Sequence, residues 1–341
     1  MNGKRRLPER RSSVTLAEVA KLAEVSEITV SRIVRNKGPI ADRTRERVMA
    51  AVTTVGYVPN RIAGALASAD SNLIGVVIPS LSNIVFPEVL RGVSAALETS
   101  GFQTVVGVTN YSLAAEESLV RSMLAWKPAA MIVAGVEHTD ATRRMLERSG
   151  VRVAELMDID STPIDVAVGL SHRRAGYDTG RYLVRQGYRR FGYVGHDWRS
   201  DRRARLRHDG LVEALDASGL AIVAHAMAKG PSSTLAGRAM LADLIARSPN
   251  IDVAVFSNDD MAVGGVFHCM AANIKLKQDL AVFGFNGLEI GQALPTPLST
   301  IASNRYLIGR IGVEKIIESP KRGPHPVIVD IGYEIVRGGT A

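Results

Sequence analysis

Residues 26–35, SEITVSRIVR, carry polar and basic side chains at a spacing that lets them share one face of a helix. The apolar side chains of the same helix point to the opposite side, at Val30, Ile33 and Val34. The outward side chains are those of Glu27, Ile28, Ser31, Arg32 and Arg35. A short helix with a polar and basic outer face is typical of the second helix of a helix-turn-helix, which contacts the bases and phosphates of DNA.

The neighbouring residues would position this helix. Thr15 and Glu18 form a capping box, which predicts a first helix directly after Thr15. After a short break, Ser26 can cap the second helix, and a third helix over 43–55 ends at Gly56. Spacing alone fits two structures, a DNA-reading headpiece and a generic three-helix bundle.

The charge of the chain is unevenly distributed. The 341 residues have a formal net charge of +8, and residues 1–61 hold 13 Lys and Arg against 6 Asp and Glu. The other 280 residues hold 29 against 28. Lys and Arg release condensed counterions when they bind phosphate, so a basic module on a neutral body favours binding to double-stranded DNA. For residues 1–11 alone, a solvated basic tail fits equally well.

Length and composition indicate a small module followed by a larger domain. Cys269 is the only cysteine, which excludes an intramolecular disulfide and a cysteine-rich zinc site. The basic N-terminus lacks the apolar stretch of a secretory signal, and apolar runs such as 73–78 are far shorter than the roughly 20 residues of a membrane span. We therefore expect a cytoplasmic protein with no membrane contact.

From residue 72 onward, short apolar runs alternate with amphipathic segments of helical length. The runs cover 73–79, 103–109, 129–135, 151–158, 166–170, 191–195, 252–258, 280–286 and 326–332. This alternation predicts parallel sheets covered on both faces, and the strands are too many for one compact sheet, so we expect two lobes. Ligands of such sheets bind at the carboxyl ends of the strands.

An enzyme of this size would be expected to show a catalytic motif. The chain contains no GxGxxG, Walker, HExxH or GxSxG motif. Its histidines at 138, 172, 196 and 268 stand singly. Asp259 and Asp260 fit the start of a helix better than a catalytic pair. We therefore expect no catalysis, no metal and no cofactor. A transport-type sugar-binding protein is a further alternative, but it would need a signal peptide and would have no headpiece.

The first part of the chain closely resembles the DNA-binding headpiece of the lac repressor/gal repressor (LacI/GalR) family, over residues 14–66. The matching runs are VTL at 14–16, VSEITVSR at 25–32, TR at 44–45 and GYVPN at 56–60. The resemblance implies a helix-turn-helix headpiece over 12–59, followed by a hinge helix and linker over 60–71.

The resemblance also implies roles for single residues. Glu27, Ile28 and Arg32 fall where the family reads bases in the major groove, Arg32 donating to a guanine and Ile28 packing on a thymine methyl. Leu66, in the hinge segment 60–68, matches the apolar wedge that enters the minor groove. The other positions that match the DNA interface, mostly through phosphate and sugar, are Thr15, Thr29, Ser31, Asn36, Thr44, Tyr57 and Asn60.

Three residues depart from the family pattern. Glu24 replaces the glycine usual in the turn, and Ala41 replaces a usual serine cap before the third helix. Glu27 places an acid on the reading face, where it repels phosphate but can accept a hydrogen bond from a cytosine amino group. These differences bear on the operator sequence rather than on DNA binding itself.

The rest of the chain resembles the effector-binding domain of the same family, which is similar to periplasmic sugar-binding proteins. The expected fold is thus an α headpiece followed by an α/β two-lobe domain over 72–341, with three crossings between the lobes. We expect the first lobe to hold 72–170 and 300–320, and the second to hold 171–299 and 321–341.

Residues at the expected strand ends match the effector contacts of the family. They are Asn83, Phe86, Asp158, Arg207, Asn258 and Asn286. Asn and Asp suit the neighbouring hydroxyls of a polyol, and Phe86 can cover an apolar face. Arg207 adds a planar cation that suits a carboxylate or phosphate. We interpret its neighbours Arg203, Arg205 and His208 as a solvated face.

Several runs resemble the gluconate-operon repressor branch of the family, namely PSLSNIVFPEVLRG, SMLAWKP, VAELMD, SNDDMAVG and FNGLEIGQ. This implies a repressor of a carbohydrate or sugar-acid operon, released by an effector such as gluconate. A neutral or phosphorylated sugar, or a co-repressor, is the alternative. Paired headpieces on a pseudo-palindromic operator imply a homodimer joined mainly through the first lobe, and no heptad repeat follows Ile335 to build a tetramer.

Overall fold

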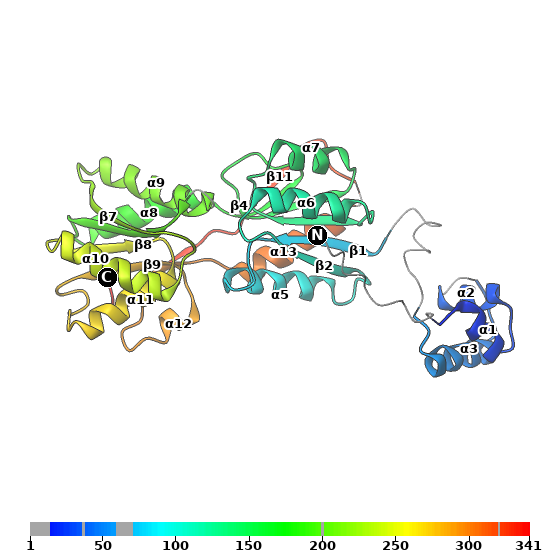
Figure 1. Cartoon of the computed structure of the whole chain (residues 1–341). Helices are drawn as coiled ribbons and strands as arrows, with labels where there is room; N and C mark the ends of the chain where they lie inside the picture. Colours follow the sequence, from blue (N-terminus) through cyan, green and yellow to red (C-terminus); the bar gives the residue numbers. More distant parts are fainter. Residues whose placement is uncertain (1–13, 36–37, 59–70, 199–200, 320) are drawn as a thin grey trace, which may run out of the picture. The chain divides into compact units, whose positions relative to one another are not determined.

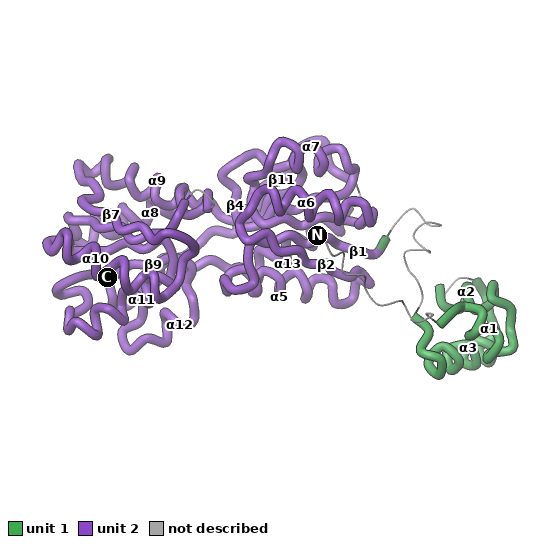
Figure 2. Tube along the Cα trace, in the orientation of Figure 1, with its two compact units in different colours: residues 1–71 green, residues 72–341 purple. Residues whose placement is uncertain are grey.

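The computed structural model describes residues 14–35, 38–58, 71–198, 201–319 and 321–341. It divides the chain into two compact units, Met1–Ser71 and Asn72–Ala341 (Figure 2). The second unit begins at Asn72.

The described part of the first unit contains α1 (Leu16–Leu22), α2 (Glu27–Val34) and α3 (Asp42–Val55). The capping box forms, since Glu18 N donates to Thr15 Oγ1 and Thr15 N donates to Glu18 Oε2, both at 3.4 Å. Ser26 Oγ accepts from Thr29 N at 3.2 Å and so begins α2. Between the helices, Glu24 has a φ of 52°, a left-handed conformation that favours the glycine it replaces.

The apolar sides of the three helices meet in one small core. Its buried members are Val19, Ala20, Ala23, Val30, Ile33, Val48 and Ala51. Ala41 gives α3 no side-chain cap, because it has no hydroxyl, and Gly56 ends the helix with a φ of 66°. Since α2 buries Val30 and Ile33 on one side, its opposite side stays exposed to solvent.

The second unit contains two six-stranded sheets covered by helices (Figure 1). The first sheet has the order β11-β5-β4-β3-β1-β2, with all neighbours parallel. Its strands are β1 (Leu73–Ile78), β2 (Gln103–Val108), β3 (Ala130–Ala134), β4 (Arg152–Asp158), β5 (Val166–Leu170) and β11 (Val327–Asp330). The pair α5 (Val85–Leu97) and α13 (Arg305–Ile317) covers one face, and α6 (Leu113–Leu124) and α7 (Asp140–Arg148) cover the other.

The second sheet has the order β12-β10-β9-β8-β6-β7, in which only β12 is antiparallel to its neighbour. Its strands are β6 (Phe191–His196), β7 (Ile222–Ala228), β8 (Val253–Phe256), β9 (Ala281–Asn286), β10 (Ser299–Ala302) and β12 (Glu334–Val336). The helices form two packed pairs, α8 (His172–Arg185) with α9 (Arg202–Asp216) and α10 (Thr234–Arg247) with α11 (Asp259–Ala271). The short α12 (Glu289–Gln292) follows β9.

The chain passes between the lobes at 171, 303–304 and 331–333. Two of the expected lobe boundaries need correction. Residues 300–320 do not all lie in the first lobe, because β10 pairs with β9 of the second sheet. Residues 321–341 do not all lie in the second lobe, because β11 pairs with β5 of the first sheet. The residues of such short strands do not indicate which of the two sheets the strand joins, because the pairing depends on strands far away in the chain.

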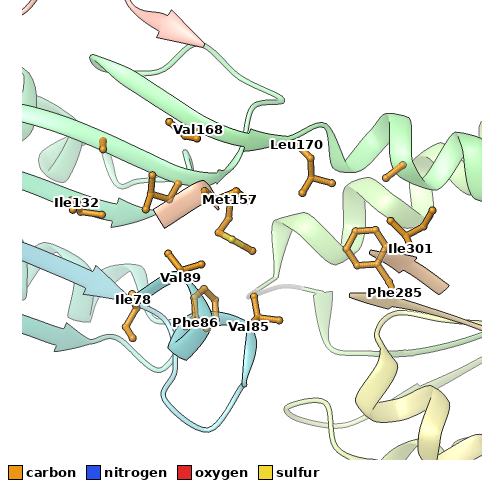
Figure 3. Close-up of a cluster of buried hydrophobic side chains, with 14 of the residues drawn as sticks. Ile78, Val85, Phe86, Val89, Ile132, Met157, Val168, Leu170, Phe285 and Ile301 are labelled. Carbon is orange, nitrogen blue, oxygen red and sulfur yellow. The ribbon is translucent and has the colours of Figure 1, made fainter. Parts of the chain in front are cut away.

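One apolar core continues through both lobes near these crossings. Figure 3 shows Phe86 and Met157 of the first lobe with Phe285 and Ile301 of the second lobe, all members of this cluster. Burial of this shared apolar surface disfavours complete separation of the lobes. Changes in the angle between the lobes must therefore preserve the packing around the crossings.

Candidate functional site

A hollow lies where the carboxyl ends of four strands of the first lobe face the start of α9 in the second lobe. It is lined by Pro79, Thr109, Tyr111, Ser112, Leu113, Glu116, Ala134, Gly135, Val136, Glu137, Asp158, Asp201, Arg202 and Arg203. The strands β4, β3, β1 and β2 are consecutive in the sheet, so the loops that follow them meet at one edge. The hollow therefore occupies the strand-end position that the sequence predicts for a ligand.

Two arginines at the start of α9 reach from the second lobe to the first. Arg202 donates to the carboxylate of Asp158 and, at 3.1 Å, to the carbonyl oxygen of Asp160. The guanidinium carbon of Arg203 lies 5.2 Å from the centroid of the Phe86 ring, a cation–π distance. The two lobes are thus connected across the hollow by charged side chains rather than by apolar packing alone.

Close backbone packing of α8 on α9 places these arginines. A Cβ added at Gly176 of α8 would lie 1.9 Å from the carbonyl oxygen of Arg207. A Cβ added at Gly210 of α9 would lie 1.9 Å from the carbonyl oxygen of Arg173. Only glycine fits at either position, because any larger residue would push the helices apart. The two glycines therefore set how closely α9 packs against α8, and this distance fixes the position of the side chains that α9 carries.

Arg207 points into the second lobe and does not line the hollow. Its Nη2 donates to the carbonyl oxygen of Ser257 at 2.8 Å, and its Nη1 lies 3.1 Å from Nδ1 of His172. The guanidinium carbon lies 4.1 Å from the ring centroid of Phe285. Burial lowers the pKa of Arg207 from its usual value, and its buried Nε has no partner among the described residues.

Asn83 and Phe86 stand at the edge of the hollow. Asn83 Oδ1 accepts from Val85 N at 3.2 Å, which orders the start of α5. Its Nδ2 donates to the hydroxyl of Tyr111, a residue that lines the hollow, at 3.1 Å. The Phe86 ring is buried and meets the Tyr111 ring edge-on, with centroids 6.4 Å apart. Phe86 is not part of the lining itself, but its ring contacts Tyr111 and Arg203, which do line the hollow.

Asn258 and Asn286 lie at strand ends of the second lobe. Asn258 is buried and caps α11, since its Oδ1 accepts from Met261 N at 3.1 Å. Asn286 ends β9 with a φ of 128°, and its carbonyl oxygen accepts from Arg305. Arg305 also donates to Glu88 of α5 at 2.5 Å, so it holds the end of β9 against the first lobe.

The structure therefore brings the six expected effector residues together only in part. Asp158 lines the hollow, and Asn83 and Phe86 contact residues that line it. Arg207, Asn258 and Asn286 lie in the second lobe and do not line it. The sequence interpretation missed Arg203, which it assigned to a solvated face. The dense arginine run RRARLR was the available signal, but its orientation depends on the packing of α9.

The carboxylates beside these arginines differ in their environment. Burial raises the pKa of Asp158, against the lowering effect of Arg202 and of a backbone hydrogen bond. Burial also opposes ionisation of Asp201, but a hydrogen bond from His196 and the charge of Arg203 outweigh it and lower the pKa of Asp201. Arg203 Nη1 is buried and has no hydrogen-bond partner in the described part of the chain. A buried donor without an acceptor is costly, so this atom is suited to a ligand oxygen.

The outer side of α2 has the composition expected of a DNA-reading surface. Glu27, Ile28 and Arg32 are exposed, and Ile28 is 68% exposed although it is a large apolar residue. The other expected contact residues within the described range are Thr15, exposed, and Thr29, Ser31, Thr44 and Tyr57, half-buried. Asn36, Asn60 and Leu66, as well as the hinge segment, lie outside the described residues. An exposed isoleucine beside an exposed arginine provides an apolar contact and a bidentate donor on one helix face.

Two kinds of feature are missing from the described residues. They contain no group of three or more His, Cys, Asp or Glu side chains placed to hold a metal ion. No helix among them is both long and apolar enough to cross a membrane.

Comparison with known proteins defines the class of this molecule. Residues 15–60 match the family model described as bacterial regulatory proteins, lacI family. Residues 71–333 match the model described as periplasmic binding proteins and sugar binding domain of LacI family. The chain belongs to the LacI family and is a DNA-binding transcriptional regulator, which confirms the family and the fold class that the sequence indicates.

Similar proteins of the family span almost the whole chain. The HTH-type transcriptional regulator GntR of Escherichia coli is 33% identical over 326 residues, 95% of this chain and 98% of that protein. The regulator of the same name from Pseudomonas aeruginosa is 35% identical over 324 residues, 94% of both chains. A LacI-family regulator from Silicibacter pomeroyi has 42% identity and a TM-score of 0.92, covering 96% of this chain and 99% of that chain. The operator-bound lac repressor dimer, 24% identical with a TM-score of 0.82 over 96% of this chain and 99% of that chain, shares the fold.

Proposed function

We propose that this regulator represses a carbohydrate or sugar-acid operon, and that an aldonic acid such as gluconate releases it from DNA. The resemblance to the gluconate-operon repressor branch and the similarity to regulators named GntR support this choice. We further propose that the protein is a homodimer, joined mainly through the first lobe, on a pseudo-palindromic operator. The hinge segment and Leu66 would then enter the minor groove at the centre of that operator.

The observation that carries the effector proposal is the buried Arg203 Nη1, which has no partner among the described residues although it belongs to the lining of the hollow. A carboxylate oxygen is the acceptor that pairs best with a guanidinium. Asp158 and Tyr111 offer an acceptor and a hydroxyl on the first-lobe side of the hollow, which suits the hydroxyl groups of a sugar chain. Recognition of a carboxylate together with hydroxyls is the chemistry of a sugar acid.

Polar contacts between the two lobes would provide the coupling to DNA. Arg202 of α9 pairs with Asp158 across the hollow. Arg305 of the first lobe pairs with Glu88 and also donates to the carbonyl oxygen of Asn286 at the end of β9. A ligand that binds between Arg203 and the first lobe favours one angle between the lobes over others. It can change DNA affinity only by the difference between its affinities for these arrangements.

Calorimetric titration of the full-length protein with gluconate, glucose and glucose phosphate tests the proposal. We expect gluconate to bind and the other two to bind at least about tenfold more weakly, because only gluconate places a carboxylate on a sugar chain. Arg203→Gln should weaken gluconate binding about tenfold or more. Arg181→Gln, also on a helix of the second lobe but outside the hollow, is the matched control and should bind normally.

Fluorescence anisotropy of labelled operator DNA tests the direction of the response. Saturating gluconate should lower operator affinity, which would support release. An increase in affinity would show a co-repressor instead, and tight binding of glucose or glucose phosphate would overturn the sugar-acid assignment.

A further inference from the structure

Three buried ionisable side chains stand behind one wall of the hollow. His138 lies between two carboxylates, with Nδ1 2.7 Å from Glu116 Oε1 and Nε2 3.3 Å from Glu155 Oε1. The side chains of His138, Glu116 and Glu155 are 1%, 9% and 0% exposed. Because both ring nitrogens face carboxylate oxygens, both carry protons and the ring is an imidazolium.

The pKa of His138 agrees with this geometry. Burial alone would lower the pKa, but the hydrogen bonds to Glu116 and Glu155 outweigh burial and raise it to about 9. The cluster therefore joins one imidazolium to two carboxylate side chains.

Of the two carboxylates, only Glu116 lines the hollow. Glu155 is turned inward, since its Oε2 accepts the backbone N–H of Ile164. Glu116 belongs to the lining of the hollow, and its Oε2 accepts no hydrogen bond from the residues that the structure describes. The imidazolium of His138 fixes the other oxygen of Glu116, so the carboxylate has a set orientation and a free acceptor atom.

The charged side chains that line the hollow suit a ligand with one anionic group. The lining contains four carboxylates, at Glu116, Glu137, Asp158 and Asp201, and two guanidinium groups, at Arg202 and Arg203. Arg202 is already bound to Asp158, and Arg203 Nε lies 3.8 Å from Asp201 Oδ1. The buried Nη1 of Arg203 still has no partner among the residues that the structure describes. A single ligand anion finds a donor at Arg203, and a second one would meet the carboxylates.

We propose that Glu116, positioned by His138, makes the effector site selective for sugar acids that carry a single negative charge. This inference rests on the proposed function. The ligand carboxylate binds Arg203, and hydroxyl groups further along the sugar chain donate to the free oxygen of Glu116. A second carboxylate or a phosphate at that end of the ligand has no proton to donate and is repelled by Glu116 in a partly desolvated site. Glu116 is thus a specificity-determining residue.

The test compares ligands with the same six-carbon chain on the full-length protein by calorimetry. Gluconate carries one carboxylate, glucarate carries a carboxylate at each end, and phosphogluconate adds a phosphate to the far end. We expect the natural protein to bind gluconate about tenfold or more tightly than either of the two more highly charged acids. In Glu116→Gln, this preference should fall about tenfold, through weaker gluconate binding and stronger glucarate binding together.

Glu117→Gln is the matched control, because Glu117 lies on the same helix, does not line the hollow and pairs with Arg121 and Thr139. It should keep the preference of the natural protein. Glu116→Asp keeps the charge and should also keep the preference, and it serves if Glu116→Gln does not fold by circular dichroism.

Three results would overturn the inference, and they differ in what they say of the proposed function. Equal binding of gluconate and glucarate by the natural protein excludes it without any variant. An unchanged preference in a folded Glu116→Gln protein also excludes the role of Glu116. In that case gluconate binding would still support a sugar acid as the effector. If neither gluconate nor the more highly charged acids bind, the proposed function fails and the inference fails with it.

Discussion

His172, the first residue of α8, lies with its Nε2 2.8 Å from the carbonyl oxygen of Met157 in β4 and so joins the second lobe to the first. Its Nδ1 lies 3.1 Å from Arg207 Nη1. A guanidinium only donates, so Nδ1 accepts and Nε2 carries the proton. Burial and the charge of Arg207 keep the pKa of His172 well below its ordinary value, which maintains this neutral form. One imidazole thus connects Arg207 to the backbone beside Asp158.

Replacement of Arg207 by alanine should weaken the effector response while leaving operator binding in the absence of effector intact. The change removes the donor to His172 and the cation above Phe285, so we expect effector affinity to fall about tenfold or more. Calorimetry and operator anisotropy check the two halves of this prediction. A variant that still responds normally would show that Arg207 has a purely structural role.

Replacement of Gly176 by alanine should destabilise the two-lobe domain. The new Cβ would lie 1.9 Å from the carbonyl oxygen of Arg207, and overpacking of this kind costs about 3 kcal/mol or more. The melting temperature should fall by roughly 2–4 °C for each kcal/mol. Gly323→Ala is the control, because the nearest atom to its Cβ would be 3.6 Å away. Equal melting temperatures for the two variants would contradict the close packing of α8 on α9.

The buried cluster around His138 predicts a loss of stability at alkaline pH. The pKa of His138 is raised from 6.5 to about 9 in the folded chain, so the folded state holds this proton more tightly than the unfolded state. The stabilisation is complete below pH 6.5 and disappears as the pH rises through 9. Its size is about 3 kcal/mol, because each pKa unit corresponds to roughly 1.4 kcal/mol.

Urea unfolding of the natural protein and of His138→Gln checks this prediction. The free energy of unfolding of the natural protein should fall between pH 6.5 and pH 9, whereas the variant should lack that part of the fall. Parallel curves for the two proteins would mean that His138 is not charged between Glu116 and Glu155.

Replacement of Arg32 by lysine should reduce operator affinity without reducing affinity for unrelated DNA. Lysine keeps the charge that attracts phosphate but cannot donate two hydrogen bonds to one guanine, so discrimination should fall by about 1–3 kcal/mol. Anisotropy with operator and scrambled duplexes at one salt concentration measures both. Equal losses on the two duplexes would place Arg32 on the phosphate backbone instead.

Leu66 lies outside the described residues, so its prediction rests on the resemblance to the family headpiece. If it forms the minor-groove wedge, Leu66→Ala should lower operator affinity about tenfold or more, because the DNA bend loses its support. Leu66→Met keeps an apolar side chain of similar size and should retain most of the affinity. Full affinity in the alanine variant would remove the wedge assignment.

Local patterns in the sequence determined the headpiece and the fold class. The capping box of Thr15 with Glu18 and the cap at Ser26 predict the helix starts because their hydrogen bonds span only three residues. The spacing of Val30 and Ile33 predicts which side of α2 is buried, since helical periodicity is a local property. Alternating apolar runs likewise predict parallel sheets in two lobes.

Tertiary structure alone decided the membership of the sheets and the composition of the hollow. The strands β10 and β11 join sheets that their sequence does not specify, because strand pairing depends on partners far away in the chain. Arg203 faces the hollow and Arg207 does not, although both lie on α9, and glycine packing against α8 sets that orientation. Glu116, His138 and Glu155 come from three separate segments, so no spacing in the sequence could indicate that they meet. Such contacts form only when the chain folds. The class of the protein can therefore be predicted from its sequence, whereas its ligand specificity cannot.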